Sequence, residues 1–162
     1  AFPDVFRTLV DAYVDVIERE VGLGAFDRIA GIPTAGLAYA AAVAYRLSKP
    51  LLYVRKERKG HGTERLVEGI VRPGDRVLLL DDVVTTGGSL ARAARAVRNE
   101  GGVVEDAVVL VDRQEGGREA LEAEGVRLHA FVTVERLITT LRDYGVVSEE
   151  QARLVLSRVR GG

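Results

Sequence analysis

The chain has 162 residues, of which 47% are hydrophobic, and a formal net charge of −1 at pH 7. This length predicts one domain, residues 1–162, with enough apolar side chains for a packed core. The balanced charge argues against a nucleic-acid partner, and the absence of cysteine excludes disulfides, a thiol nucleophile and a cysteine-bound metal. No apolar run approaches the roughly 20 residues of a membrane-spanning helix, and no leader-like segment opens the sequence. We therefore expect no membrane partner and a cytoplasmic location.

The first part of the chain predicts two helices separated by a strand. An amphipathic helix starts at Pro3, a favourable first position, and ends before Gly22. The segment Asp27–Ile32 follows as a buried strand, and a turn at residues 33–36 leads into an alanine-rich helix that ends near Leu47. The turn presents backbone N–H groups at a strand end, which is typical of an anion site, although an ordinary turn explains it equally well.

A cationic segment follows the next predicted strand, Leu51–Arg55. It reads Arg55-Lys56-Glu57-Arg58-Lys59-Gly60-His61-Gly62-Thr63 and has no apolar face. We expect it to be exposed and mobile, and we expect a strand over Glu64–Val71 to return the chain to the domain. A loop of this kind could close over a polyanion and neutralise the charge of a leaving group. The alternative is a solvated surface with no role in binding.

The most informative stretch begins with the apolar run Val77–Leu80. This run predicts a buried parallel strand, which ends in the adjacent acids Asp81 and Asp82. A short turn leads from the acids into a helix whose apolar residues, from Leu90 onward, share one face. The turn consists of Val83, Val84, Thr85, Thr86, Gly87, Gly88 and Ser89.

The composition of this turn is typical of a phosphate site. Its glycines let backbone N–H groups converge on one anion beside the positive end of the helix, and its hydroxyl side chains add donors. The ionised acids before it only accept hydrogen bonds, which suits the hydroxyl groups of a sugar. The stretch therefore predicts a ribose 5-phosphate site. The alternative is a plain strand-to-helix turn with solvated acids, which gives no reason for paired acids and three hydroxyls together.

The rest of the chain continues the alternation of strands and helices. Val103–Val111 predicts another apolar strand, which ends in the loop Asp112–Gly117. Arg113 in that loop is either a surface residue or the partner of a planar carboxylate, which a guanidinium binds through two parallel hydrogen bonds. An outer strand over residues 126–133, in which His129 is expected to be structural, and two closing helices follow.

The stretch from Val77 to Ser89 resembles the phosphoribosyl diphosphate signature of the type I phosphoribosyltransferases at every position. Two further runs resemble orotate phosphoribosyltransferases in particular, namely Arg-Lys-x-x-Lys-x-His-Gly from Arg55 and Asp-Arg-Gln-Glu-x-Gly from Asp112. The resemblance covers about residue 27 to the end. It implies an α/β fold, a single Rossmann-like domain with a parallel central sheet flanked by helices. The N-terminal hood segment that the family carries is not apparent.

The resemblance also implies a reaction and a set of residues. The phosphoribosyl group of 5-phospho-α-D-ribose 1-diphosphate (PRPP) would pass to orotate, giving orotidine 5′-phosphate and diphosphate in UMP biosynthesis. The residues implied for PRPP are Arg55, Lys56, Lys59, His61, Asp81, Asp82 and the turn residues 83–89, with Thr34, Ala35 and Gly36 at the diphosphate. Those implied in catalysis are Lys59, His61, Asp81 and Asp82, and those implied at orotate are Thr85 and Arg113.

Further expectations concern the cofactor and the partner. The resemblance implies Mg²⁺ that is carried by PRPP, with no direct protein ligand. It implies a homodimer with shared active sites, in which the cationic loop of each subunit enters the neighbour's site. Three alternatives stay open at this point: a phosphoribosyltransferase for a purine or another base, a non-catalytic regulator that senses PRPP, and a generic sugar-phosphate binder without chemistry.

Overall fold

The computed structural model describes residues 2–55 and 66–160 of the chain. These residues form a six-stranded sheet in the order β3-β2-β1-β4-β5-β6, parallel throughout except for the edge pair β2–β3. The strands are β1 (Arg28–Gly31), β2 (Leu51–Val54), β3 (Val67–Glu68), β4 (Val77–Val84), β5 (Asp106–Asp112) and β6 (Arg127–Thr133). The helices of the described part are α1 (Pro3–Val16) with its π-helical extension η1 (Ile17–Val21), α2 (Ala35–Arg46), α3 (Gly88–Asn99), α4 (Gly117–Ala123), α5 (Val134–Asp143) and α6 (Glu149–Arg160).

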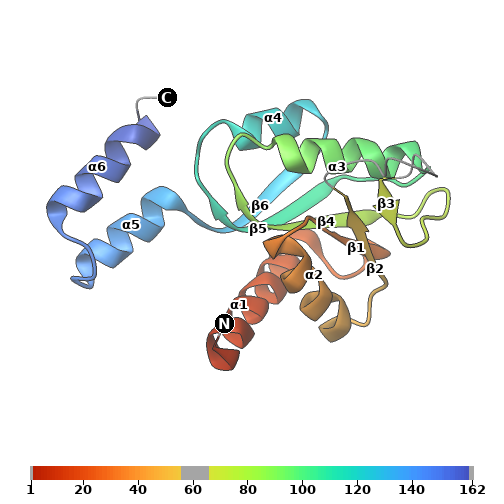
Figure 1. Cartoon of the computed structure of the whole chain (residues 1–162), viewed down its shortest axis with the longest axis horizontal. Coiled ribbons are helices and arrows are strands. Elements are labelled where there is room, and N and C mark those ends of the chain that lie inside the picture. The colour runs from red at the N-terminus through yellow and green to blue at the C-terminus, as the bar shows by residue number, and fades with distance from the viewer. Residues whose placement is uncertain (1, 56–65, 161–162) are drawn as a thin grey trace.

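Helices cover both faces of this sheet (Figure 1). On one face α1 and α2 pack on a core that includes Leu78 and Leu80 of the central strand β4. On the other face α3 and α4 pack on a core that includes Val77 and Leu79. A strand that is buried on both sides has an unbroken apolar sequence, which is why this stretch is readable as a parallel strand. The predicted α/β domain with a parallel sheet flanked by helices is confirmed.

Strand β4 differs from the prediction in where it ends. The strand was expected to end at the paired acids, but the ladder with β5 continues past them to Val84. Side chains of a regular strand alternate between the two faces. Val84 should therefore share a face with Leu78 and Leu80, yet it belongs to the core on the opposite side, under α3 and α4. The alternation is thus broken between Leu80 and Val84, in the segment that carries the two acids.

The return strand after the cationic segment is also shorter than predicted. The prediction was Glu64–Val71, but β3 spans only Val67–Glu68, and Glu64 lies outside the described residues. Its two residues pair with Tyr53 and Val54 of β2 in an antiparallel ladder. Directly after Glu68 comes Gly69, a glycine with φ of 112°, a backbone conformation that does not continue a regular strand. The strand accordingly stops after two residues.

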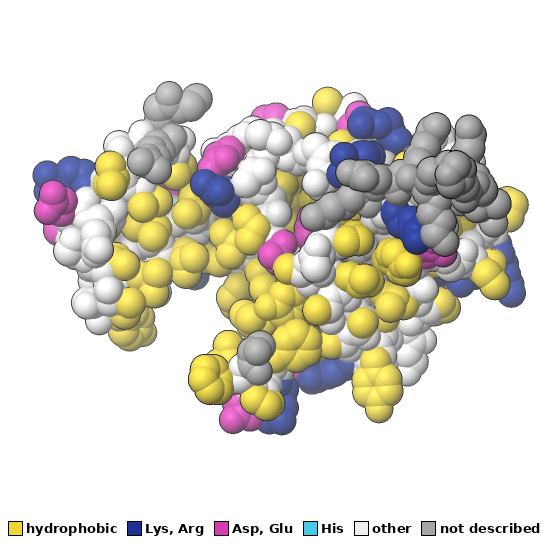
Figure 2. Space-filling model, in the orientation of Figure 1, with side chains coloured by type: hydrophobic (Ala, Val, Ile, Leu, Met, Phe, Trp, Pro, Cys, Tyr) yellow, Lys and Arg dark blue, Asp and Glu magenta, His cyan; other side chains and the backbone are white. Residues whose placement is uncertain are grey.

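The last two helices form a hairpin that extends beyond β6, away from the rest of the domain (Figure 1). No residue of α5 is fully buried, and Tyr144, Val146 and Leu154 on the hairpin are largely exposed. In the space-filling view apolar side chains gather over this hairpin and over α1 (Figure 2). None of the helices in the described part combines the length and the apolar character needed to cross a bilayer.

The amino ends of the strands are joined by ion pairs. Arg76, just before β4, binds Asp27, just before β1, through Nε–Oδ2 and Nη2–Oδ1 contacts of 3.0 and 2.8 Å. Side-chain and backbone hydrogen bonds from Arg76 hold the pKa of the Asp27 carboxyl well below its usual range. Arg28 pairs in the same region with Asp75, a carboxylate that also accepts a backbone N–H and whose pKa is likewise lowered.

A second charged cluster lies at the amino ends of β5 and β6. Asp106 is buried, and both of its oxygens accept hydrogen bonds from Arg127 at 2.9 Å. His129 lies between two carboxylates, with Nε2 2.8 Å from Asp106 and Nδ1 3.1 Å from Glu20 of η1. Burial by itself would raise the pKa of Asp106, but hydrogen bonds from Arg127 and His129 bring it below its usual value. His129 therefore ties η1 to the sheet, in agreement with the predicted structural role.

Candidate functional site

A pocket of about 340 Å³ opens at the carboxyl end of β4. It is formed almost entirely by the stretch that the sequence singled out, because the end of the strand, the turn and the first residues of α3 lie side by side. The residues that line it are Asp81, Val83, Val84, Thr85, Thr86, Gly87, Gly88, Ser89, Leu90 and Arg92. The carboxyl edge of a parallel sheet is the usual position of a ligand site in this class of fold.

The turn from β4 into α3 has the geometry of a phosphate loop. Gly87 has a φ of 78°, which an L-residue rarely adopts, and α3 begins at Gly88. The backbone N–H groups of the first helical turn have no partner inside the helix, so they are available to an anion above the turn. Thr85, Thr86 and Ser89 border the same space. The structure thus brings the predicted donors together in one pocket.

The phosphate loop rests directly on the start of α4. A Cβ placed on Gly117 would lie 2.5 Å from the carbonyl oxygen of Thr85 and 3.2 Å from the backbone nitrogen of Gly87. A Cβ on Gly87 would lie 2.9 Å from the carbonyl oxygen of Gly117. Only a glycine at each position permits this backbone-to-backbone contact. Because Arg113 N also donates to the Val84 carbonyl at 3.0 Å, the loop that carries Arg113 is fixed to the phosphate loop at both of its ends.

The two acids lie at the edge of this pocket in different ways. Asp81 lines the pocket, whereas Asp82 does not. One oxygen of Asp81 accepts the Asp82 N–H at 2.9 Å, and one oxygen of Asp82 accepts the Val83 N–H at 3.0 Å. Both side chains are partly exposed. The structure therefore places both acids beside the phosphate loop, with Asp81 the nearer of the two.

The turn at residues 33–36 lies next to the acids, as a shared site requires. Gly36 is buried, and a Cβ on it would lie 2.6 Å from Oδ1 and 2.8 Å from Cα of Asp81. Thr34 and Ala35, by contrast, are exposed to solvent at the start of α2. A ligand that reaches from Asp81 toward α2 would meet the backbone of this turn.

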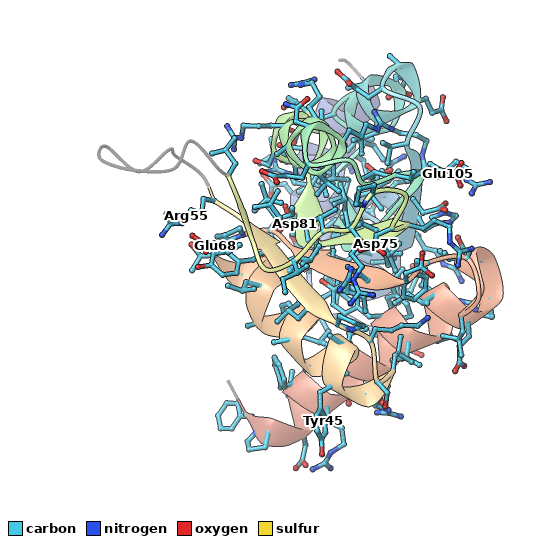
Figure 3. The ribbon with its side chains drawn as sticks, turned by 90° about the vertical axis from the view of Figure 1, so that its right-hand side faces the viewer. Tyr45, Arg55, Glu68, Asp75, Asp81 and Glu105 are labelled. Carbon is cyan, nitrogen blue, oxygen red and sulfur yellow. The ribbon has the colours of Figure 1, made fainter. Side chains whose placement is uncertain are left out.

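Of the cationic segment, the structure describes only the first residue, Arg55. Arg55 forms an ion pair with Glu68 of β3, with an Nε–Oε1 distance of 3.0 Å (Figure 3). This pair lies at the β2–β3 edge of the sheet. Lys56, Lys59 and His61, which were predicted to act on the diphosphate, lie outside the described residues.

Arg113 lies on the loop that follows β5. Its guanidinium is half-exposed and pairs with Glu115 at 2.6 Å. The loop is shaped by the buried Asp112, whose carboxylate accepts Gln114 N at 2.8 Å and Arg118 Nη2 at 3.3 Å. The predicted loop is thus present beside the phosphate pocket, with an arginine whose contacts are made at the surface.

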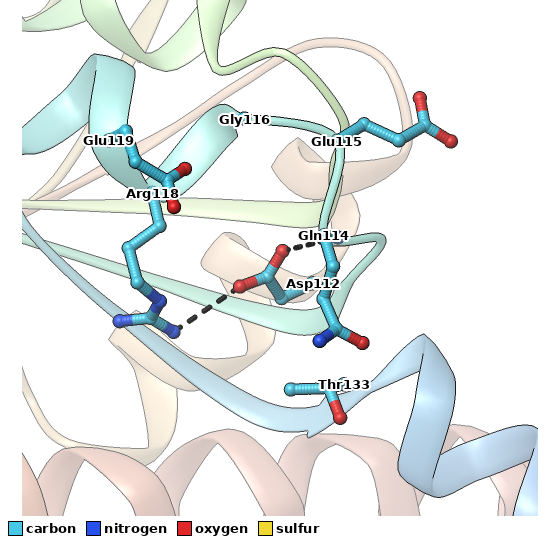
Figure 4. A pocket seen from close by; sticks show the side chains of 7 residues that line it. All are labelled: Asp112, Gln114, Glu115, Gly116, Arg118, Glu119 and Thr133. Carbon is cyan, nitrogen blue, oxygen red and sulfur yellow. Dashed lines mark hydrogen bonds and ion pairs between the residues drawn. The ribbon is translucent and has the colours of Figure 1, made fainter. Parts of the chain in front are cut away.

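A second, larger cavity of about 600 Å³ is lined by residues of this loop, of α4 and of the end of β6 (Figure 4). It is lined by Asp112, Gln114, Glu115, Gly116, Arg118, Glu119 and Thr133. The polar atoms of Asp112 and Arg118 are used within the protein, since Arg118 also donates to the Leu128 carbonyl at 2.7 Å. We assign the ligand site to the smaller pocket, because it combines the glycine-rich loop after β4, the start of α3 and the acid Asp81.

One polar residue of the pocket was not predicted. Arg92, the fifth residue of α3, lines the phosphate pocket and is exposed. A cation near the start of a helix is disfavoured by the helix dipole unless an anion is bound there. The arginine four residues after Gly88 was therefore a signal in the sequence that an anion binds at the start of this helix.

Comparison with known proteins identifies relatives of this site. Residues 17–126 match the model of the phosphoribosyl transferase domain family. An orotate phosphoribosyltransferase of Cenarchaeum symbiosum is 46% identical over 98% of this chain and 79% of its own length. The crystal structure of the orotate phosphoribosyltransferase from Aeropyrum pernix is 42% identical, with a TM-score of 0.77 over 90% of this chain and 78% of that one. The UMP synthase of Leishmania donovani is 31% identical, with a TM-score of 0.87 over 99% of this chain and 34% of that one.

Proposed function

The chain belongs to the orotate phosphoribosyltransferase family, and from this membership we infer that it transfers the 5-phosphoribosyl group of PRPP to orotate, releasing diphosphate. The observation that carries the inference is the pocket at the end of β4, where a phosphate loop and the acid Asp81 lie side by side. The product, orotidine 5′-phosphate, is an intermediate of pyrimidine nucleotide synthesis. No part of this reaction requires a protein nucleophile, since the attacking atom belongs to the base.

We propose roles for the residues of the pocket. The loop from Thr85 to Ser89 holds the 5′-phosphate through backbone N–H groups and hydroxyls, with Arg92 adding a positive charge. Asp81 and Asp82 accept hydrogen bonds from the ribose hydroxyls. When the C1′–O bond to diphosphate breaks, positive charge develops on the ribose, and two nearby carboxylates stabilise it. The same charges orient the sugar, so that binding and catalysis use one pair of groups.

The diphosphate leaves toward the turn at residues 33–36, which adjoins Asp81. We propose that backbone N–H groups of this turn and the hydroxyl of Thr34 bind it, together with Arg55 and the segment that contains Lys56, Lys59 and His61. Cations at that point neutralise the charge of the leaving group. Mg²⁺ is the proposed cofactor, since a hard divalent ion prefers phosphate oxygens and retains part of its water shell. The carboxylates of the acid pair accept backbone N–H groups and face the sugar rather than forming a metal cage.

Incubation with PRPP, Mg²⁺ and a panel of bases tests the function directly. Orotidine 5′-phosphate should form from orotate, with no nucleotide formed from adenine, guanine, hypoxanthine or uracil. A nucleotide from another base alone would assign the enzyme to a different branch of the family. Binding of PRPP without turnover of any base would instead support a regulator that senses PRPP. The proposal includes a cytoplasmic location, where the free nucleotide precursors are made.

Arg113→Ala is expected to weaken orotate binding far more than PRPP binding. We propose that the guanidinium pairs with the carboxylate of orotate, with Thr85 contacting the same base, and loss of a charge-assisted hydrogen bond typically costs about 1.5–3 kcal/mol. The Michaelis constants of both substrates measure the effect. Arg136→Ala on α5, which removes an equally exposed cation elsewhere, serves as the control. Equal weakening of both substrates would remove Arg113 from the base site.

We also propose that the working unit is a homodimer in which the cationic segment serves the neighbouring subunit. Mixing a Lys59→Ala chain with an Asp81→Asn, Asp82→Asn chain should then restore activity, although each is inactive alone. In a heterodimer with segments acting in trans, one site receives an intact segment over an intact acid pair, while the other receives both defects. Turnover after mixing is the measurement. Absence of recovery, with subunit exchange demonstrated by mass spectrometry, would show that each segment serves its own subunit.

A further inference from the structure

A tyrosine beneath the acid pair is buried and bonded to the strand that carries it. Tyr13 of α1 has no exposed surface, and its hydroxyl donates to the carbonyl oxygen of Asp81 at 2.7 Å. The two residues are 68 positions apart in the sequence. Tyr13 lies outside the phosphate pocket and outside the segment that resembles the PRPP signature. Its bond reaches β4 within the segment between Leu80 and Val84, where the side-chain alternation of the strand is broken.

The peptide unit that receives this bond joins the two acids. Its carbonyl belongs to Asp81 and its N–H to Asp82. The carbonyl accepts the Tyr13 hydroxyl at 2.7 Å, and the N–H donates to Oδ1 of Asp81 at 2.9 Å. The peptide plane is therefore held at both ends. Because a peptide is planar, the direction of its carbonyl fixes the direction of its N–H, and this N–H holds the carboxylate of Asp81.

The tyrosine itself is held rigidly. Its ring lies 5.4 Å, centroid to centroid, from the ring of Tyr39, which stacks on Phe6 at 5.3 Å. Burial, and next the charges of Asp82 and Asp81, raise the pKa of the Tyr13 hydroxyl far above its usual range. The hydroxyl therefore remains protonated and can only serve the carbonyl as a donor.

From this geometry we propose that Tyr13 is a positioning residue for the reaction: its hydroxyl fixes the peptide between Asp81 and Asp82, and with it the N–H that holds the Asp81 carboxylate toward the ribose of PRPP. The inference rests on the proposed function of the acid pair. Gly36 lies against Asp81 from the side of α2, so the acid is confined by both helices of that face.

Tyr13→Phe tests the proposal, because it removes the hydroxyl and keeps the ring. We expect the Michaelis constant and the dissociation constant for PRPP to rise about three- to tenfold, the usual range for one lost hydrogen bond of this kind. The rate constant should fall as well, while the Michaelis constant for orotate stays unchanged. Tyr39→Phe, which removes a hydroxyl from the same aromatic stack, should leave all of these constants unchanged.

A double-mutant cycle separates positioning from general packing. If Tyr13 acts through the Asp81 carboxylate, Tyr13→Phe should weaken PRPP binding in the wild-type background and have little further effect in an Asp81→Asn background. An equal effect in both backgrounds would overturn the proposal. So would PRPP constants like those of the wild type, or a Tyr13→Phe protein that does not fold, since the hydroxyl would then serve the fold alone. A wild-type protein without orotate turnover would refute the proposed function instead, and the PRPP binding cycle would still report on Tyr13.

Discussion

A chain that carries Asp81→Asn together with Asp82→Asn is expected to fold normally and to lose its transferase activity by about a hundredfold or more, as removal of groups that stabilise transition-state charge typically does. The fold should persist because the oxygen of an asparagine side chain can still accept the backbone N–H groups of Asp82 and Val83 that the carboxylates now accept. What is lost is the negative charge next to the ribose and half of its hydrogen-bond acceptors.

Steady-state turnover with saturating PRPP and orotate measures this effect, and circular dichroism checks the fold. Asp4→Asn with Asp15→Asn makes a matched control, since these exposed acids of α1 form ion pairs only with Arg7 and Arg19 on the surface in the described part. The control has the same change in net charge. Turnover near the wild-type rate in a folded double mutant would show that the acid pair does not act on the sugar.

Gly117→Ala is expected to be the second severe change, although the residue makes no proposed contact with substrate. A Cβ at this position lies 2.5 Å from the Thr85 carbonyl oxygen and 2.7 Å from Cγ2 of Val84, so the phosphate loop must move. We expect PRPP affinity to fall more than tenfold and the free energy of unfolding to fall by about 1–3 kcal/mol, the usual cost of overpacking.

The direction of this stability change is diagnostic. At a site whose backbone conformation alanine can adopt and whose Cβ meets no other atom, replacement of glycine by alanine stabilises a protein. Gly24→Ala is the control, because a Cβ there meets nothing within 4 Å and the backbone is not in the left-handed region. Thermal unfolding and calorimetric titration with PRPP provide both readouts. If Gly117→Ala raised the melting temperature and left PRPP affinity unchanged, the contact between α4 and the phosphate loop would not contribute to PRPP binding.

The sequence was sufficient for the parts of the site that are continuous in the chain. The run from Val77 to Ser89 carries its own strand, turn and helix start, and the structure folds it into one pocket. The apolar strands and the alanine-rich α2 were predictable for the same reason, since their periodicity reflects burial on a sheet. The predicted end of this strand at the acids was two residues short, because an acid near a strand end has the same local pattern whether the ladder stops at it or continues.

Other features of the site depend on contacts between distant segments. Tyr13 reads as one more apolar position of an amphipathic helix, and nothing near it in the sequence indicates that its hydroxyl meets Asp81. Gly117 reads as part of a glycine pair that starts a helix, whereas the structure shows that it touches the phosphate loop. Periodicity reports which face of an element is buried and not which neighbour it meets. Such contacts become visible only when the strand order is known.

The ion pairs at the amino ends of the strands have a consequence for how this protein can change over evolutionary time. Arg76 and Asp82 are six residues apart along one extended strand, a separation of about 20 Å. That exceeds the Debye length of about 8 Å at physiological ionic strength. The electrostatic interaction between exposed charges at the two edges is therefore largely screened. Pairs such as Arg76–Asp27 can therefore be exchanged, added or lost as a lineage adapts to heat or salt, while selection on the chemistry acts at the opposite edge of the same sheet.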